Sequence, residues 1–567
     1  MIHLFISSFL ASIFHFIAGK FLSNHFNLDN RSFYSLSLTS IIGLIFLSFI
    51  SLTLNFFIPL SYTVNTIIFI AIILLFLIFI KFFLKKNEIR FLFKYILFCT
   101  IGTFSLLIFS KVYVPDAGLY HLPFVNIINE NKIIIGLSNI HQRFGHTSIM
   151  QYLSAIHFNN VFGLNGILIP LSSIGIYSII FFLDQIKNIK KISISNTFSI
   201  LIIFYICWKM NRYSEYGNDA PAHFIYFIII QLYLNFLEKS SKIDETNFFT
   251  LSFLSLFAFL NKTTLVLSLL IPVICLNHIN LKNLINFKYL FLILFFFSWI
   301  FKNILTTGCL IYPIPITCLD LLWTNLDKVS NVYDVSIGTE AWSKDWVNQK
   351  GVVLNYENFL KNFYWLKFWL NNHFQKILTI IIPYILIIIF FIIFLKFFKK
   401  KKIEVKKINL KIYIPIFLII TLSIFIWFIK FPVYRFGYSY IVSFFALSFS
   451  IYIYYIHKNN YFFNLKKICR GIICIAIIVL TSKQLVRISK NINSKYESVP
   501  WPYYNYLKKE YRETNVKEFS KNGVFFYYLP KNAYCYYSKS PCTSVEVDSN
   551  LNKKINSLKY KIFYFSG

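Results

Sequence analysis

The fold class follows from stretches such as residues 376–411, which read KILTIIIPYILIIIFFIIFLKFFKKKKIEVKKINLK. The first part is long and apolar enough to cross a bilayer, because about 20 apolar residues in a helix span the hydrocarbon layer. The second part, 396–411, carries eight lysines against the single Glu404. Lysine-rich short loops mark the cytoplasmic side of a membrane protein. The stretch therefore predicts a spanning helix whose C-terminal end lies at the cytoplasm.

Runs of this kind recur along the whole chain. They lie at 3–21, 38–58, 62–83, 93–112, 164–184, 196–211, 219–237, 247–261, 263–278, 288–305, 376–397, 411–429, 437–456 and 468–486. The chain is 57% hydrophobic and 14% charged, with a mean hydropathy of +0.61, whereas soluble domains are about 25% charged. We therefore predict an all-α polytopic membrane protein with about 13 to 14 transmembrane helices. The first run lacks a basic flank and a cleavage site, so it is predicted to stay as a helix rather than to be removed as a signal peptide.

The distribution of lysine and arginine gives the expected orientation. The loops 84–94, 185–195 and 457–470 are basic and fall on the same side as 396–411 if the helices alternate. That side is predicted to be cytoplasmic. The net charge is +33. Because the lysines lie in short loops between apolar runs, we interpret them as topology signals, and we expect the lipid bilayer and no nucleic acid as a partner. The predicted location is the bacterial cytoplasmic (inner) membrane, crossed many times.

The remaining polar segments are then predicted to be extracytoplasmic. They are the loops 113–163 and 306–375 and the C-terminal tail 487–567. In the first loop, residues 149–156 are amphipathic and suit an interfacial helix. The tail has apolar runs at 524–528 and 560–564, which predict two strands of a small α/β domain. We expect three parts: N-terminal helices 1–92, a transmembrane core 93–486, and the tail.

Two cysteines of the tail are close together in the sequence. Cys535 and Cys542 lie in YCYYSKSPCT, on the side predicted to be oxidising. They could close a short disulfide. The alternative is a pair of free thiols.

The loop 113–163 holds the densest group of candidate site residues. His121, His141, His146 and His157 lie here, four of the eleven histidines in the chain. Asp116 could act as a general base, could hold a divalent metal such as Mg²⁺ or Mn²⁺, or could simply cap the helix that follows.

Two cations of the chain suit phosphate binding. Arg143 could clamp a phosphate with two hydrogen bonds or snorkel to the headgroups. Lys262 lies between two apolar runs, where it could neutralise a phosphate or mark a turn.

Two further polar segments lie at predicted helix ends. Asp219 and His223 are four residues apart at a helix start, so they would share one face, and Asp219 also suits a helix N-terminus structurally. Arg435 and Tyr438 lie in a second such segment, where they could bind a lipid-linked phosphate or anchor the helix at the interface.

The order of these segments resembles the GT-C superfamily of membrane glycosyltransferases, in particular a poorly characterised bacterial branch with a glycosyltransferase-like membrane core. The matching stretches are DAGLYHLP (116–123), GLSNIHQRFGHTS (136–148), NDAPAH (218–223), NKTT (261–264), KNILTTGCLIYP (302–313), YRFGYSY (434–440) and LPKNAYCYYSKSPCT (529–543). The resemblance runs from about residue 90 to the C-terminus. Better-known members have paired acidic residues in the first outer loop and usually one helix before it, and this chain differs in both features.

The resemblance implies a transfer reaction at the outer membrane face. The donor would be a sugar on a polyprenyl phosphate, and the acceptor an envelope glycan, lipid or protein. Asp116 would be the catalytic base or metal ligand, with His121 beside it, and Arg435 would hold the lipid phosphate, with Arg143 or Lys262 assisting. This reading expects Asp116, His121, Asp219 and Arg435 to meet in one cavity. The alternatives are a polysaccharide polymerase or ligase, and a flippase or transporter of lipid-linked glycans.

Overall fold

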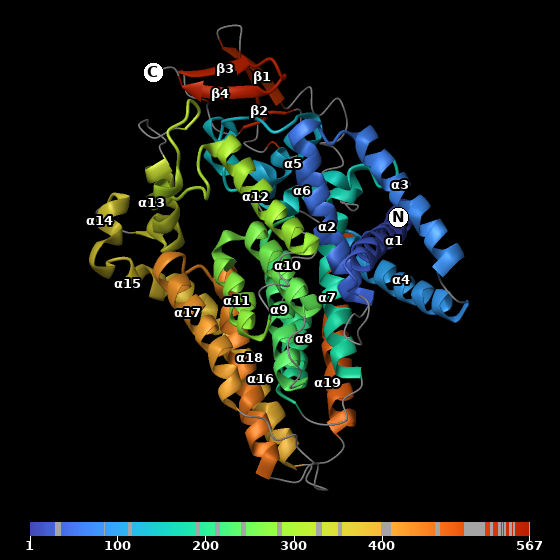
Figure 1. The fold of residues 1–567 in the computed structure, drawn as a ribbon. Helices are drawn as coiled ribbons and strands as arrows, with labels where there is room; N and C mark the ends of the chain where they lie inside the picture. Colours follow the sequence, from blue (N-terminus) through green and yellow to red (C-terminus); the bar gives the residue numbers. More distant parts are fainter. Residues whose placement is uncertain are drawn as a thin grey trace.

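The protein is a bundle of apolar helices with a small β-structure at one end (Figure 1). The computed structural model describes residues 1–28, 36–83, 86–110, 116–187, 193–209, 216–239, 245–279, 286–324, 332–349, 354–397, 410–459, 465–492, 516–521, 525–530, 535, 537, 540–543, 547 and 550–565. Within these residues it is an all-α polytopic membrane protein apart from its β-hairpins. Most of the basic run 396–411 lies outside the described residues.

The long helices occur where the apolar runs predict them, and shorter helices lie in the segments 113–163 and 306–375 between those runs. They are α1 (Ile2–His25), α2 (Leu36–Phe57), α3 (Tyr62–Phe83), α4 (Lys86–Leu107), α5 (Leu122–Glu130), α6 (Ile149–Ile156), α7 (Ile169–Lys187), α8 (Ile194–Lys209), α9 (Asp219–Lys239), α10 (Glu245–Asn261), α11 (Leu270–Cys275), α12 (Phe287–Thr307), α13 (Val332–Ser343), α14 (Tyr356–Leu360), α15 (Leu366–Trp369), α16 (Gln375–Phe397), α17 (Ile414–Lys430), α18 (Tyr434–Asn459) and α19 (Leu465–Ile492).

Ten helical segments of the described chain are long and apolar enough to cross a membrane. Three shorter apolar helices accompany them, at Tyr62–Leu75, Ile194–Lys209 and Thr263–Cys275. The third follows the break at Lys262, where α10 stops and a 3-10 helix begins at Thr263. The predicted 13 to 14 helices thus include two segments, Ile194–Lys209 and Thr263–Cys275, that are short for a bilayer span, whereas Tyr62–Leu75 is part of the 22-residue α3.

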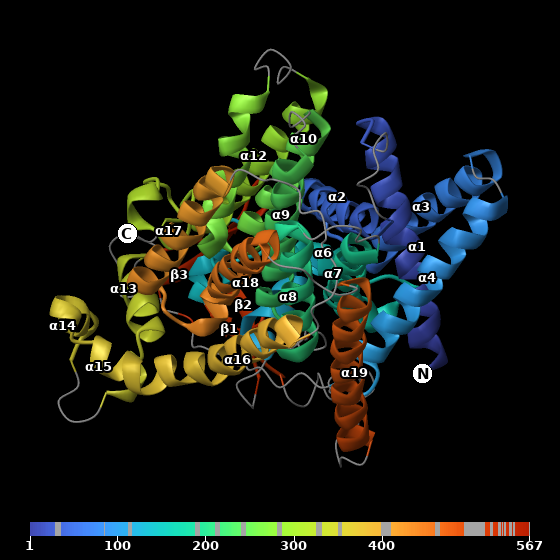
Figure 2. The same cartoon turned by 90° about the horizontal axis from the view of Figure 1, so that it is seen from below.

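The helices differ strongly in how far they are enclosed. In α9, 94% of the apolar window is buried, and in the segment that contains α7 the share is 89%. The corresponding value for α19 is 6%. Figure 2 shows α8 and α9 in the middle, with α16, α19 and α3 at the periphery. The most enclosed helices therefore form the centre of the bundle, and the peripheral ones present apolar side chains outward, as lipid contact requires.

The N-terminal helices pack tightly on one another and on the core. A Cβ atom on Gly19 of α1 would lie 1.8 Å from the carbonyl oxygen of Thr39 in α2, so only glycine permits this approach. His15 of α1 then reaches the core, since its Nε2 lies 2.8 Å from Nε2 of His157 and its Nδ1 lies 2.9 Å from the hydroxyl of Tyr177 in α7. These contacts join α1 directly to the central helices.

The described part of loop 113–163 is folded into the protein. All eight residues of α6 are buried, so the interfacial position predicted for 149–156 is wrong. The polar residues at the start of α6 have partners within the protein: Ser148 and Gln151 form a capping box, and the Gln151 amide also lies 3.3 Å from His121. The amphipathic pattern thus reflects contacts with other protein segments rather than with headgroups.

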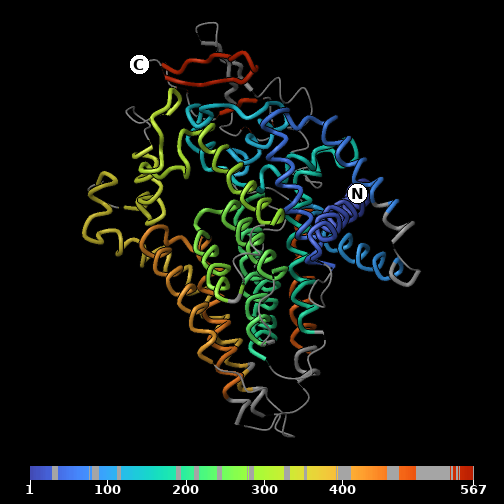
Figure 3. Tube along the Cα trace, viewed as in Figure 1, coloured from blue at the N-terminus to red at the C-terminus, as the bar shows by residue number. Residues whose placement is uncertain are grey.

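The described part of the tail forms two antiparallel hairpins, β1 (Val516–Lys521) with β2 (Phe525–Pro530), and β3 (Leu551–Ile555) with β4 (Lys561–Phe565). The strands predicted near 524–528 and 560–564 correspond to β2 and β4. Strand β4 also bonds to the first outer loop, since Phe563 N donates to the carbonyl of Ile135 at 2.9 Å. Figure 3 shows the tail trace directly above this loop.

Two disulfides are formed within the described residues. The predicted bridge joins Cys535 to Cys542, and we call it the tail bridge. A second one, which the sequence did not indicate, joins Cys309 to Cys318 after α12, and we call it the loop bridge.

Candidate functional site

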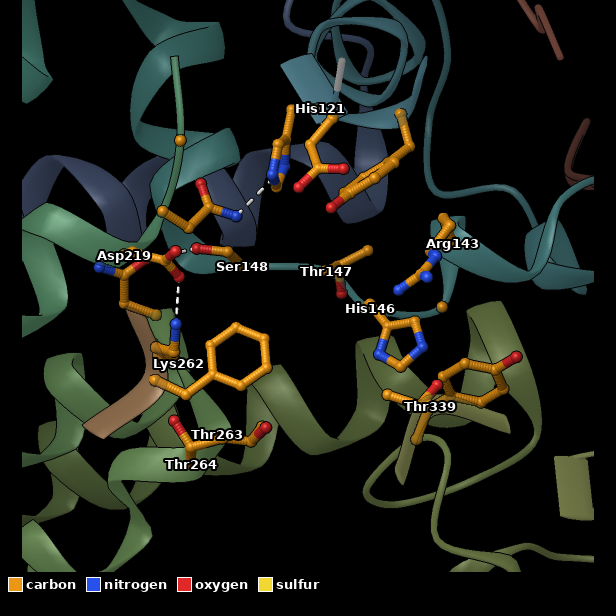
Figure 4. Close-up of a pocket in the computed structure, with 18 of the residues that line it drawn as sticks. His121, Arg143, His146, Thr147, Ser148, Asp219, Lys262, Thr263, Thr264 and Thr339 are labelled. Carbon is orange, nitrogen blue, oxygen red and sulfur yellow. Dashed lines mark hydrogen bonds and ion pairs between the residues drawn. The ribbon is translucent and has the colours of Figure 1, made fainter. Parts of the chain in front are cut away.

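A polar cavity lies at one end of the central helices (Figure 4). It is lined by the start of α9, the residues after α10, the end of α12, part of α13 and the start of α18, together with segments 116–121 and 143–148. The cavity has a volume of about 210 Å³. The structure brings together six of the predicted site residues here: Asp116, His121, Arg143, Asp219, Lys262 and Arg435.

Asp116 and Arg435 form an ion pair inside the cavity. Arg435 Nη1 lies 3.1 Å from Asp116 Oδ2, and the side chains are 29% and 28% exposed. Asp116 directly precedes a π-helical turn, Ala117–His121, but its side chain makes no capping hydrogen bond. The alternative of a helix cap is therefore wrong. The Nε–H of Arg435 is buried and has no partner among the described residues, so this arginine retains a donor for a ligand.

Asp219 and Lys262 form a second pair, which Figure 4 marks with a dashed line. Asp219 is the first residue of α9, and Lys262 follows the last residue of α10. The Lys262 ammonium also lies 4.1 Å from the centre of the Phe436 ring and donates to the carbonyl of Arg435 at 3.4 Å. Both pairs are thus connected through the start of α18.

His121 is a neutral acceptor in the cavity wall. The side-chain amides of Asn218 and Gln151 each lie 3.3 Å from its Nδ1, which therefore accepts, leaving the proton on Nε2. Burial lowers the pKa of His121 to about 4, although Asp116 and Asp219 act in the opposite direction. His121 is therefore uncharged near neutral pH.

A different wall carries Arg143 and His146, which Figure 4 draws away from Asp219 and Lys262. The main-chain N–H of Arg143 donates to Nδ1 of His141 at 3.0 Å, which fixes the turn that positions the guanidinium. Burial, followed by the nearby Arg143 charge, lowers the pKa of His141 to about 4 and that of His146 to about 3. Both histidines are uncharged near neutral pH.

His223 and Tyr438 do not line the cavity. His223 Nε2 lies 3.0 Å from the carbonyl of Arg435, and its Nδ1 lies 2.7 Å from the hydroxyl of Ser439. Because a carbonyl only accepts, Nε2 carries the proton and Nδ1 accepts from the hydroxyl. The Tyr438 ring stacks 3.9 Å from the His223 ring. The structure therefore does not bring these two predicted site residues into the cavity, and both instead hold the start of α18.

Sequence reasoning missed two residues of the site, one behind the cavity wall and one in its lining. Lys302 is fully buried behind the wall, where its side-chain nitrogen donates to Thr147 and Asn303 and lies 3.5 Å from the centre of the Trp299 ring. Its position inside an apolar run hid it, although the stretch 302–313 had been noted. Trp342 of α13 stacks 5.2 Å from the Arg435 guanidinium, and no motif indicated that the second outer loop reaches the site.

The residues present do not suit a divalent metal at Asp116. Mg²⁺ and Mn²⁺ need several oxygen ligands, and nowhere in the described chain do three His, Cys, Asp or Glu side chains meet. A guanidinium already occupies the cationic position beside Asp116. No metal-dependent step is therefore derived for this site.

One known protein family matches most of the chain. A family described as a domain of unknown function, DUF8201, matches residues 1–442. The chain belongs to this family. The match includes α1 and α2 as well as every residue of the two ion pairs, so the N-terminal helices and the cavity belong to one family unit. No curated protein and no solved structure matches the chain.

Proposed function

We propose that the protein is a membrane glycosyltransferase that uses a sugar linked to polyprenyl phosphate. The observation that carries this proposal is the Asp116–Arg435 pair in a cavity at the ends of spanning helices. A carboxylate beside an arginine offers a base for an acceptor hydroxyl and a cation for a leaving phosphate. The acceptor is an envelope glycan, lipid or protein, and the reaction takes place at the outer face of the bacterial cytoplasmic membrane.

The location of the cavity suits a donor with one apolar end. The lining residues come from the ends of α9, α10, α12 and α18. A polyprenyl chain would lie in the bilayer beside these helices, and its phosphate would enter the cavity at their ends.

In the proposed reaction, Asp116 accepts the proton of the acceptor hydroxyl. The acceptor oxygen then forms a bond to the anomeric carbon, and the bond from that carbon to the phosphate oxygen breaks. Polyprenyl phosphate leaves with the electron pair, and the anomeric configuration is inverted. Asp116 later releases its proton to water.

Arg435 can serve both parts of this reaction. Its Nη1 orients Asp116, while its unpartnered Nε–H is available to the leaving phosphate. Lys262 adds a second cation whose ammonium is fixed by Asp219 and by the Arg435 carbonyl. Such preorganised donors are worth more in an enclosed site than in water.

The test is the surface-glycan mass profile of a deletion strain. Complementation with wild type or with Asp320→Asn should restore the missing sugar, because Asp320 is exposed and lies outside the cavity. Asp116→Asn at the same membrane level should not restore it. Full restoration by Asp116→Asn would refute the proposed base and favour transport of a lipid-linked glycan.

A further inference from the structure

The cations of the cavity are not equally neutralised. Arg435 and Lys262 each have a carboxylate partner, Asp116 and Asp219. The guanidinium of Arg143 makes no ion pair and no side-chain hydrogen bond within the described residues, and its side chain lies only 5.9 Å from the centre of the Tyr120 ring. An unpaired, half-buried charge is costly, and a bound anion would offset this cost.

We propose that Arg143, His146 and Thr147 form a second anion-binding position in the cavity, for a carboxylate or phosphate carried on the sugar being transferred or accepted. This inference rests on the proposed function and specifies the class of glycan. The second position is separate from the one that holds the lipid phosphate at Arg435 and Lys262.

The donors of this position have unused hydrogen-bonding capacity. Nε2 of His146 is buried and has no partner among the described residues. Lys302 donates to the hydroxyl oxygen of Thr147, so the hydroxyl proton of Thr147 is free to donate elsewhere. The guanidinium fork, the Thr147 hydroxyl and the His146 tautomer that carries its proton on Nε2 together offer several N–H and O–H donors to an anion.

Lys302 acts as a positioning residue. It also donates to Asn303 Oδ1 at 2.6 Å, and the Asn303 amide in turn donates to the carbonyl of Leu310 at 2.9 Å. Lys302 has no carboxylate partner within the part of the chain that is described. Within the described residues, Arg143 and Lys302 thus lack an acidic partner, whereas Arg435 and Lys262 are each paired with a carboxylate.

The charges that line the cavity favour binding of an anionic sugar beside Arg143. Asp116 and Asp219 would repel a second negative group on their side of the cavity. Arg143 would attract it, and Arg forks bind both carboxylates and phosphates with two parallel hydrogen bonds. A uronic acid or a sugar phosphate fits this arrangement, and a neutral hexose would leave Arg143 unpaired.

The experiment measures binding to the full chain in nanodiscs by saturation-transfer NMR. The probes are glucose, glucuronate and glucose 6-phosphate, with inorganic phosphate as a separate titrant. We expect at least one anionic sugar to bind about 10-fold more tightly than glucose, since an added charge-assisted pair supports such a difference. The tighter of the two identifies the carboxylate or the phosphate as the anion.

The variants assign the position. Arg143→Gln should abolish the preference for the anionic sugar, Arg143→Lys should retain part of it, and Arg435→Gln should retain it while weakening inorganic phosphate. Arg90→Gln is the matched control, because Arg90 is exposed on α4, outside the cavity. Thermal unfolding in the same nanodiscs verifies that each variant is folded.

Two results would overturn the inference. One is equal binding of all three sugars by the wild type, and the other is a preference that survives in folded Arg143→Gln or is lost only in Arg435→Gln. No sugar transfer is required, so this assay can fail while the glycan profile supports the proposed function. Equally, the preference can stand when Asp116→Asn restores the glycan, which would refute only the transfer reaction.

Discussion

Removal of the Lys262 charge should expose how much the second ion pair contributes to stability. Lys262→Met leaves Asp219 without its ammonium partner. Truncating one member of a fully buried pair costs about 3–5 kcal/mol, and an exposed pair contributes about 0–1 kcal/mol. Since the side chains of Lys262 and Asp219 are 9% and 25% exposed, we expect a loss of about 2 kcal/mol, between these limits. Asp219→Asn in the same chain should recover at least half of it.

The assay is a double-mutant cycle on the free energy of unfolding, measured by steric trapping in bicelles. The matched control is Lys288→Met, because Lys288 pairs with Glu245 at 3.0 Å with similar exposed fractions, 8% and 32%. It should lose a comparable free energy without losing the glycan product, since Lys288 lies outside the cavity. Strictly additive effects of the Lys262 and Asp219 substitutions would refute the pairing.

Three further outcomes follow from particular contacts. Burial lowers the pKa values of His121 and His146 to about 4 and 3, so the unfolded state binds more protons than the folded state between about pH 6.5 and these values. The free energy of unfolding should therefore fall as the pH drops through that window, by about 1–2 kcal/mol per histidine at pH 5. His146→Gln should reduce this fall in an unfolding series from pH 7.5 to 5. Gly19→Ala should lower the free energy of unfolding by about 2 kcal/mol or more through overpacking, because the added Cβ would overlap a main-chain oxygen. The control Gly471→Ala should leave thermal unfolding unchanged, because a Cβ at Gly471 meets nothing within 4 Å. Both the loop bridge and the tail bridge should resist a membrane-impermeant thiol reagent until reduced, as peptide mass spectrometry can show, and labelling of either without reductant would contradict the structure.

The sequence predicts the helices well because the bilayer imposes a simple rule. Every main-chain polar group must be satisfied within the membrane, so long apolar runs become helices. The break at Lys262 was also visible, because a polar pair interrupts two apolar runs. The position of α6 was not, since an amphipathic pattern looks the same whether its polar side meets headgroups or the side chain of His121.

The site was only partly predictable for a related reason. Asp116 and Arg435 each stand out as polar residues at a helix end, but their contact joins positions 319 residues apart. Nothing local to either residue encodes that distance. His223 illustrates the opposite error: its position one helical turn after Asp219 suggested a shared site, yet its ring bonds to main-chain and hydroxyl groups behind the wall.

The two walls of the cavity give different constraints on function. The paired wall, with Asp116, Arg435, Asp219 and Lys262, is nearly neutral as a whole, which suits a site that must hold a base and a leaving anion together. The Arg143 wall is not neutral within the described chain, and no step of the proposed transfer consumes its charge. If Arg143 served the lipid phosphate, the partnered cations opposite would have no separate purpose. An anion on the glycan itself accounts for both walls, which is why the choice of sugar probe tests more of the structure than the transfer reaction alone.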